Sequence, residues 1–348
     1  MEKDTKIQIG ITQGDYNSVN YEAIIRSFVD LGIMELCHPL VFGLPKIATA
    51  HIHRLAIPDF SFQSIKQFSE FNAKRANIFE ISTEEAIWEY GKSTEMSAKY
   101  AFLALQKAME YIETKQLKAL ITMPLNSEEL RRLQGAFKNQ TQYLKTKSQA
   151  SSIFKIAIAD SLRMCAISST EIDDPSIFAI DKIQQRILQF YTSLKTNFSL
   201  HTPRIAILSL SKNMNDTYIS KDDSKILVPI VEEAFMQGMP VFGPYPAQTF
   251  FASSDLSKFD GVICMYKEQM NCAFLEKSSK SLVYFTEGLP FVHLEPAIPL
   301  LYTMDKNMDT LSENLLQTIY QTIDILRSRE QYAQLTKKPL AIEKKEKE

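Results

Sequence analysis

The chain has 348 residues, which is more than one ordinary hydrophobic core holds and favours two domains. Its 39 basic and 41 acidic residues give a net charge of −2, so the composition indicates neither a nucleic-acid-binding surface nor an acidic tail. Apolar residues make up 45% of the chain but never run for about eighteen positions, so we expect a globular protein without a membrane span.

The cysteines and the N-terminal residues indicate a cytoplasmic protein. The four cysteines form no C-x-x-C pair, and Cys37, Cys165 and Cys264 lie within apolar runs, as buried thiols in a reducing compartment do. The N-terminal residues lack the long apolar region of a signal peptide.

Strand and helix patterns alternate along the first half of the chain. A strand over 6–12 precedes a helix over 22–31, and a strand over 38–43 precedes a helix after Pro45. Ser82 and Glu85 have the spacing of a capping box ahead of a helical segment. The clearest long helix covers 94–114, and a strand over 117–126 then ends in a proline-bearing loop.

The second half continues the alternation. The stretch 154–169 predicts two strands around a turn, and 177–200 predicts a helix. The strands that follow cover 203–211, 261–266 and 281–290, and the helices cover 222–238 and 308–329. This order predicts a mostly parallel sheet covered by helices.

Common catalytic and phosphate-binding motifs are absent. The chain has no G-x-x-x-x-G-K-[ST], no G-x-G-x-x-G and no G-x-S-x-G sequence, and only 10 glycines. His51 and His53 lie in a segment of helical character, where positions i and i+2 diverge, so we do not expect a metal site there.

Polar residues instead follow predicted strands, where ligands of α/β proteins bind. Asp15 follows the first strand and is expected either to hold a ligand hydroxyl or to cap the next helix. Asn126 follows a second strand and has Glu129 at the spacing of a helix cap. Lys267, Glu268 and Gln269 follow the strand "GVICMY".

Seven stretches carry a family resemblance. "GITQGDYNSVNYEAII" is similar to the pattern Gly-Asp-Pro-x-Gly-x-Gly-x-Glu, and "LITMPLNSEEL" to Thr-Ala-Pro-Ile-Asn-Lys-Glu. "FKNQTQYL" stands where the family pattern is Phe-Pro-Gly-His-Thr-Glu, and "RIAILSLSKNMND" stands where it is Leu-Asn-Pro-His-Ala-Gly-Glu. "GPYPAQTFF" is similar to Gly-Pro-x-Pro-Ala-Asp-x-x-Phe, "MYKEQM" to Met-Tyr-His-Asp-Gln-Gly, and "GLPFVHLEPA" to Gly-Leu-Pro-Phe-x-Arg-Thr-x-Pro. In this order the chain resembles the 4-hydroxythreonine-4-phosphate dehydrogenases of pyridoxal phosphate biosynthesis over nearly its whole length.

The resemblance implies a two-lobed α/β/α fold with mostly parallel sheets and an active-site cleft between the lobes, like that of isocitrate and isopropylmalate dehydrogenases. On this basis we expect a first α/β domain over 1–135 plus 300–348. The second α/β domain is expected over 136–299, with the dimerisation surface and the former metal and substrate side.

The family's metal ligands are replaced. The resemblance implies a divalent metal, zinc or magnesium, held by three histidines, and the matching residues here are Thr170, Asn213 and Lys267. Threonine and asparagine oxygens are weak uncharged donors, and a lysine ammonium repels a metal cation, so we expect no metal. No catalytic set is intact, and Lys267 and Glu268 are the catalytic candidates.

The substrate-cleft candidates combine retained and substituted positions. They are Asp15, Glu22, Thr122, Asn126, Gln140, Thr141, Gln269, Tyr284 and His293. Gln140 and Thr141 match the family's His-Thr pair, whereas Leu275, Tyr284 and His293 replace its lysine, asparagine and arginine. His293 would restore part of the lost positive charge only when protonated. Ala297–Leu300 replaces an Asp-His-Gly-Thr loop near NAD, the cofactor that the resemblance implies.

Three functions follow from these patterns. We favour a homologue whose active site has degenerated, a pseudoenzyme that acts as a non-catalytic binding or partner subunit. The alternatives are a working NAD-dependent dehydrogenase that oxidises 4-phosphohydroxy-L-threonine in vitamin B6 biosynthesis, and a metal-free enzyme that uses Lys267 on a new substrate. The implied partners are a second copy in a homodimer, an active paralogue in a heteromer, and a small phosphorylated ligand, with no nucleic acid or membrane.

Overall fold

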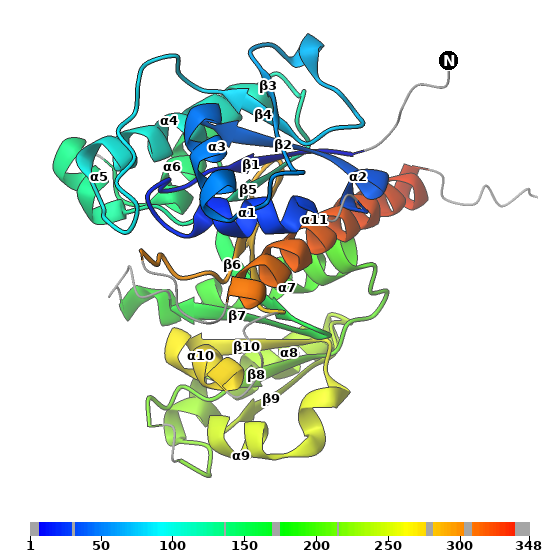
Figure 1. The fold of residues 1–348 in the computed structure, drawn as a ribbon. Coiled ribbons are helices and arrows are strands. Elements are labelled where there is room, and N and C mark those ends of the chain that lie inside the picture. Colours follow the sequence, from blue (N-terminus) through cyan, green and yellow to red (C-terminus); the bar gives the residue numbers. More distant parts are fainter. Residues whose placement is uncertain are drawn as a thin grey trace, which may run out of the picture. The chain divides into compact units, whose positions relative to one another are not determined.

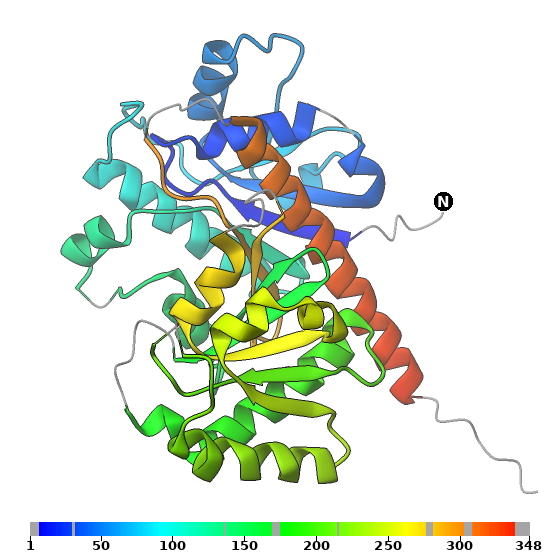
Figure 2. The ribbon, with the colours of Figure 1, turned by 90° about the horizontal axis from the view of Figure 1, so that it is seen from below.

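The structure is a computed structural model that describes residues 7–29, 32–135, 137–168, 175–213, 216–275, 281–302 and 308–337 (Figures 1 and 2). The chain divides into two compact units. Unit 1 contains Met1–Ser161 and Phe274–Ile323, and unit 2 contains Leu162–Ala273 and Asp324–Glu348.

The strands of unit 1 lie in the order β3-β4-β2-β1-β5-β12-β11-β6. Their bounds are β1 Ile7–Thr12, β2 Cys37–Gly43, β3 Gln63–Ile65, β4 Asn77–Glu80, β5 Ala119–Thr122, β6 Phe154–Ala159, β11 Val283–Glu287 and β12 Val292–Pro296. The pairs from β3 to β12 are parallel, whereas β11 is antiparallel to both β12 and β6. The mostly parallel sheet confirms the fold class expected from the sequence.

Helices connect the parallel strands of unit 1. Their bounds are α1 Asn20–Val29, α2 Ile33–Leu36, α3 Pro45–Arg54, η1 Phe68–Glu70, α4 Glu95–Glu113, α5 Ser127–Leu133 and α6 Gln140–Lys147. α1 packs against α3, while α4 packs against β1, β2 and β5. Because the crossovers run in opposite directions along the sheet, right-handed connections place α4 on the face opposite α1 and α3. Figure 1 shows α1 and α3 on the near side of the strands.

Unit 2 contains the parallel strand order β7-β10-β8-β9. Its strands are β7 Leu162–Ser168, β8 Ile205–Leu208, β9 Val241–Tyr245 and β10 Gly261–Tyr266. Its helices are η2 Pro175–Phe178, α7 Ile180–Phe198, η3 Asp223–Leu227, α8 Val228–Met236, α9 Ala247–Ala252, η4 Ser254–Lys258 and α10 Lys267–Leu275. Buried apolar side chains of β8 and β10, such as Ile207 and Ile263, form its core.

The limits of the compact units differ from the expected domains, 1–135 with 300–348 and 136–299. The physical reason is strand pairing: β12 pairs with β5, β11 with β12, and β6 with β11, so these strands extend the sheet of unit 1. At the C-terminal side, the division falls inside helix α11 (Met308–Lys337), after Ile323.

The predicted capping box at Ser82 is wrong. The Ser82 hydroxyl accepts a bond from the backbone of Glu84 at 3.1 Å, but no helix follows directly. The capping box lies twelve positions later, where Thr94 and Ser97 exchange bonds between side chain and backbone at 3.1 and 3.2 Å and begin α4. The predicted long helix itself is confirmed as α4. Its prediction depended only on the helical period of its apolar residues and not on the position of its cap.

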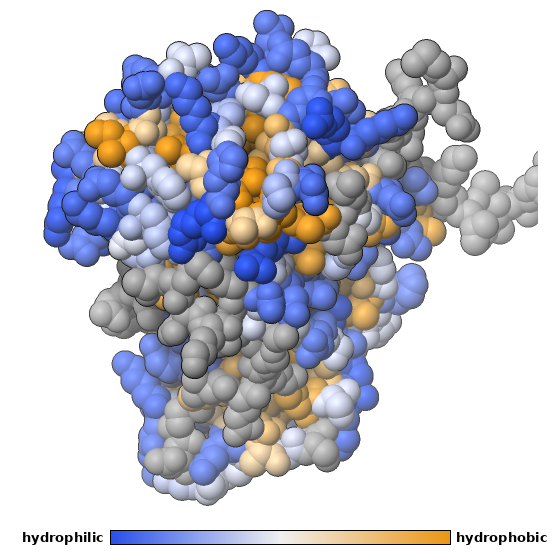
Figure 3. Space-filling model, in the orientation of Figure 1, coloured by the Kyte–Doolittle hydropathy of each residue, from blue (hydrophilic) through white to orange (hydrophobic). Residues whose placement is uncertain are grey.

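Figure 3 shows hydrophilic and apolar side chains interspersed over the face of the molecule that it draws. Among the helices of the described residues, none combines the length and the apolar character needed to cross a bilayer.

Candidate functional site

Asp15 lies directly after β1, at the edge of unit 1 where the parallel strands β1, β5 and β12 end. Its buried carboxylate accepts hydrogen bonds from the hydroxyls of Tyr302 at 2.8 Å and Ser97 at 3.0 Å. The backbone N–H of Asn17 donates a third bond at 3.0 Å. Burial has the largest effect and raises the pKa of Asp15, while the three hydrogen bonds act in the opposite direction. Asp15 is therefore a hydroxyl acceptor whose partners are this chain's own side chains.

The turn around Asp15 is closed by backbone and side-chain bonds. Gly14 has φ +63°, and a Cβ there would lie 2.3 Å from the carbonyl oxygen of Pro124, so only glycine fits. Ser18 and Asn20 stand where the resemblance places glycines. The Ser18 hydroxyl donates to the Asp15 carbonyl at 2.6 Å, and the Asn20 amide donates to the Pro124 carbonyl at 2.8 Å. The Ser18 and Asn20 side chains therefore form hydrogen bonds with backbone carbonyl groups of this chain.

Two further candidates of unit 1 have structural partners. The Asn126 amide oxygen accepts bonds from the backbone of Glu128 at 3.1 Å and Glu129 at 3.0 Å, which confirms that it caps a helix. Glu22 is fully buried and forms an ion pair with Arg54. The Arg54 guanidinium lies 3.6 Å from the centre of the Tyr90 ring, so a cation–π contact holds it over Glu22.

His293 lies between two hydroxyls in the core of unit 1. Its Nε2 is 3.0 Å from the Thr122 hydroxyl and its Nδ1 is 2.9 Å from the Thr286 hydroxyl. Because the ring is fully buried, its pKa falls to about 4. A neutral imidazole with both nitrogens bonded inside the core does not restore the positive charge of the arginine that it replaces.

A polar row crosses three strands of unit 1 and reaches α6. In the sheet register Tyr284 lies opposite Glu295, and Thr286 lies opposite Lys155. The Lys155 ammonium is 2.7 Å from the Glu295 carboxylate, which also accepts a bond from the Thr141 hydroxyl at 3.3 Å.

Gln140 and Tyr284 complete the candidates of unit 1. The Gln140 amide donates to the carbonyl of Met123 at 3.3 Å, and its buried side-chain oxygen has no hydrogen-bond donor in the structure. The Lys155 ammonium lies 5.9 Å from the centre of the Tyr284 ring. Burial raises the pKa of Tyr284, so the phenol stays protonated at neutral pH.

Gln269 connects the carboxyl ends of β10 and β8 in unit 2. Its side-chain oxygen accepts bonds from the backbone of Met265 at 2.8 Å and Tyr266 at 3.3 Å. Its amide donates to the carbonyls of Ser209 at 3.0 Å and Ser211 at 3.2 Å. With all four bonds made to backbone groups of these strand ends, Gln269 holds them together, and the amide has no bond left for a ligand.

The positions that the resemblance assigns to a metal carry other chemistry. Lys267, half-buried, begins α10, and the next residue, Glu268, is exposed. The Asn213 amide donates to the Asp216 carboxylate at 2.8 Å, so its nitrogen is committed to that carboxylate. Thr170 lies outside the described residues. Among the residues that the structure describes, no three His, Cys, Asp or Glu side chains form a group with metal-ligand geometry.

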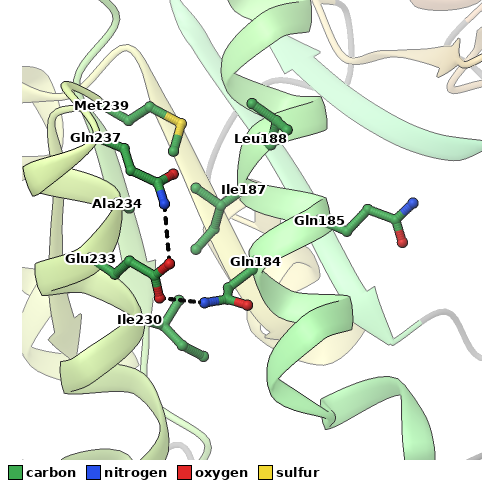
Figure 4. A pocket seen from close by; sticks show the side chains of 9 residues that line it. All are labelled: Gln184, Gln185, Ile187, Leu188, Ile230, Glu233, Ala234, Gln237 and Met239. Atoms are coloured by element: carbon green, nitrogen blue, oxygen red, sulfur yellow. Dashed lines mark hydrogen bonds between the residues drawn. The ribbon is translucent and has the colours of Figure 1, made fainter.

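A hollow of about 230 Å³ lies between α7 and α8 of unit 2 (Figure 4). Its walls are mostly apolar, and Glu233 accepts bonds from Gln184 at 2.6 Å and Gln237 at 3.1 Å. None of the candidates from the sequence lines it, and it holds no nucleophile or base beyond Glu233.

Sequence reasoning missed four residues of these clusters: Ser97, Lys155, Glu295 and Tyr302. Glu295 has a readable signal, since "VYFTE" and "VHLEP" alternate polar and apolar residues and thereby place Tyr284, Thr286, His293 and Glu295 on one face. Ser97 and Tyr302 have no such signal, because they reach Asp15 only through the folding of distant segments.

Mostly parallel strands joined by helices, with polar residues after the strand ends, define an α/β protein, and proteins of this class commonly bind ligands at the carboxyl ends of their strands. Comparison with known proteins identifies the family. Residues 35–298 match the family model described as pyridoxal phosphate biosynthetic protein PdxA, and the chain belongs to this family.

Curated relatives cover most of the chain. It is 29% identical over 333 residues to 4-hydroxythreonine-4-phosphate dehydrogenase of Bacteroides thetaiotaomicron, covering 94% of this chain and 91% of the relative. It is 24% identical over 298 residues to D-threonate 4-phosphate dehydrogenase of Cupriavidus necator, covering 82% of this chain and 86% of the relative.

Solved structures show the same fold. 4-Hydroxythreonine-4-phosphate dehydrogenase of Klebsiella pneumoniae has a TM-score of 0.72 at 20% identity, over 91% of this chain and all of that one. The enzyme of Burkholderia phymatum has a TM-score of 0.66 at 20% identity, over 92% of this chain and 99% of that one. At this identity the likeness concerns the fold alone.

Proposed function

We propose that this PdxA-family protein does not carry out metal-dependent dehydrogenation and acts as a non-catalytic binding or partner subunit. One observation carries the proposal: Lys267 begins α10 at the carboxyl end of β10, at a position that the resemblance assigns to a metal ligand. An ammonium there supplies a positive charge where a metal site needs a neutral or negative donor.

The donor set does not fit a divalent ion. At about 4 Å, two unit positive charges near a protein surface repel by about 4 kcal/mol, and a divalent ion doubles that repulsion. The Asn213 amide nitrogen already donates to Asp216, which leaves one weak carbonyl oxygen for a metal. We therefore derive no reaction step through a metal.

The loop that the resemblance assigns to NAD does not fit a dinucleotide either. Residues 297–300 read Ala-Ile-Pro-Leu, which offers no side-chain hydrogen-bonding group, and Pro299 has no backbone N–H. Ile298 is buried, so its side chain belongs to the core of unit 1.

Retention of the fold without the reactive groups supports a partner role. The family resemblance implies a dimer, so this chain is proposed to pair with a second copy or with a catalytically intact paralogue. Such a subunit needs the strands, turns and helix caps that the structure contains, and it does not need the histidines that are absent.

The test is an assay of NADH formation by the purified protein with 4-phosphohydroxy-L-threonine, NAD and either zinc or magnesium. The Bacteroides thetaiotaomicron relative is the positive control. We expect no turnover by this chain. Metal-dependent NADH formation that scales with protein concentration would overturn the proposal.

A triple variant tests whether the side chains at these three positions prevent metal binding. Thr170→His, Asn213→His and Lys267→His together restore three imidazoles, and zinc binding to this triple variant is measured by calorimetry. We expect zinc affinity to rise at least tenfold over the wild type. Equal zinc affinity in both proteins would show that these positions do not control metal binding.

A further inference from the structure

The Glu295 carboxylate is held like a bound anion. Lys155 contacts it at 2.7 Å, and the Thr141 hydroxyl donates to it at 3.3 Å. Only 17% of the Glu295 side chain is exposed, against 40% for Lys155. Burial is the largest single effect and acts to raise the pKa of Glu295, but the Lys155 charge and the hydrogen bonds from Lys155 and Thr141 together lower it. Glu295 is therefore a carboxylate at neutral pH.

The groups around Glu295 are those that proteins use to bind small anions. Lysine ammonium and threonine hydroxyl both donate to anionic oxygens. Thr141 is the second residue of α6, so the partial positive charge of the helix N-terminus lies on the same side. Tyr284 lies opposite Glu295 in the sheet register, and its protonated phenol is a third kind of hydrogen-bond donor.

We propose that Glu295 is an internal anion that fills this site and makes it reject phosphate. The inference deepens the proposed function, on which it rests for the idea that the cleft residues no longer serve a phosphorylated substrate. The site is therefore expected to exclude a phosphorylated ligand at Thr141, because a phosphate group that contacts Lys155 also meets the negative charge of Glu295, whose carboxylate lies 2.7 Å from the Lys155 ammonium.

Displacement of Glu295 by phosphate is also unfavourable. A carboxylate that loses its cation while it stays buried carries an unpaired charge, which is strongly destabilising. A ligand without an anionic group meets neither penalty. Glu295 is thus a specificity-determining residue that separates neutral or cationic ligands from phosphorylated ones.

The test measures phosphate binding by Glu295→Gln and by the wild type. Glutamine keeps the size of the side chain and an oxygen for Thr141, but it removes the charge that repels phosphate. Inorganic phosphate is titrated by calorimetry and by thermal unfolding, against sodium chloride of equal ionic strength, with no metal or NAD present. We expect phosphate affinity at least tenfold higher in Glu295→Gln, with a Tm that rises with phosphate concentration.

Two further variants sharpen the result. Lys155→Met added to Glu295→Gln is expected to abolish the gained affinity, because it removes the cation. Glu113→Gln is the matched control, since Glu113 also pairs with a lysine, Lys147 of α6, at 3.6 Å but on the surface. We expect no gain in phosphate affinity from it.

Phosphate that stabilises the wild type as much as Glu295→Gln overturns the inference, as does a folded Glu295→Gln that gains no phosphate affinity. If Glu295→Gln fails to fold by circular dichroism, Glu295→Ala is measured in the same way with the same criterion. The assay contains no metal and no NAD, so its result is separate from that of the dehydrogenase assay.

Discussion

The Tyr302 hydroxyl donates to the Asp15 carboxylate at 2.8 Å, although 287 positions separate the two residues. The bond joins the segment after β12 to the turn after β1, at the edge of unit 1 where ligands of α/β proteins bind. A backbone bond from Val19 to the Leu301 carbonyl at 3.0 Å supports the same contact. The chain thereby satisfies with its own Tyr302 hydroxyl a carboxylate that we expected either to hold a ligand hydroxyl or to cap the next helix.

Tyr302→Phe tests this contact. Loss of a hydrogen bond to a charged group costs about 1.5–3 kcal/mol, so we expect the free energy of unfolding to fall by that amount at pH 7. Chemical denaturation measures it, and Tyr320→Phe, a tyrosine on the surface of α11, is the control with little expected change.

The same variant has an expected pH dependence. The folded-state pKa of Asp15 is raised, so its protonation adds stability that is fully present below about 3.8 and is lost as the pH rises through the folded value. The Tyr302 bond lowers that pKa, so Tyr302→Phe raises it further. We therefore expect the loss of unfolding free energy in Tyr302→Phe, relative to the wild type, to become smaller as the pH falls towards 3.8. A loss that does not depend on pH would contradict a bond to the Asp15 carboxylate.

Gly14→Ala tests the turn that positions Asp15. The alanine combines a left-handed backbone, about 1–2 kcal/mol, with a Cβ that would lie 2.3 Å from the Pro124 carbonyl. We expect the free energy of unfolding of Gly14→Ala to fall by at least about twice this backbone penalty. Gly238→Ala is the matched control, because Gly238 has φ +81° with nothing within 4 Å of an added Cβ. Equal losses in the two variants would show that the Pro124 approach does not matter.

Gln269→Leu tests the connection between β10 and β8. The substitution leaves backbone groups of both strand ends without their side-chain partner, and each unsatisfied buried group costs about 1–3 kcal/mol. We expect a loss of several kcal/mol, measured by urea unfolding. Gln185→Leu, at an exposed position of α7, is expected to change stability little. A loss at Gln269 no larger than at Gln185 would mean that the four bonds are dispensable.

His293→Gln tests the buried imidazole. The folded-state pKa is about 4, below the ordinary value of 6.5, so the unfolded state takes up the proton first and stability falls as the pH drops from 6.5 to about 4. Over that window one such histidine accounts for about 3 kcal/mol. We expect His293→Gln to lose less stability with falling pH than the wild type does. The exposed His53→Gln is the control, and a pH dependence unchanged in His293→Gln would contradict the burial of a neutral ring.

The sequence predicted the elements better than their contacts. The long helix α4 follows from apolar periodicity, and the strands β1, β2 and β10 follow from short apolar stretches; both are local properties of the sequence. The capping role of Asn126 was also predictable, because a cap and its partners are three residues apart. The domain limits were not, because they depend on β12 pairing with β5, whose paired residues, such as Val292 and Ala119, are 173 positions apart in the chain.

Site residues divide in the same way. Asp15 and Gln269 were found because they follow strands, but their partners are Tyr302, Ser97 and the carbonyls of another strand, which no local pattern reveals. His293 was expected to restore part of the lost charge only when protonated, and its burial between two hydroxyls shows why it stays neutral. Glu295 lay in a readable alternation, yet its pairing with Lys155 needs the register of β11 with β6.

Calorimetric titration of the wild type with magnesium or zinc tests the loss of the metal site most directly. We predict no saturable one-to-one binding that depends on Asn213 or Lys267. Saturable binding of one ion per chain, weakened by Asn213→Ala, would contradict the account, because it would mean that an amide and an ammonium leave room for the cation that we infer they exclude.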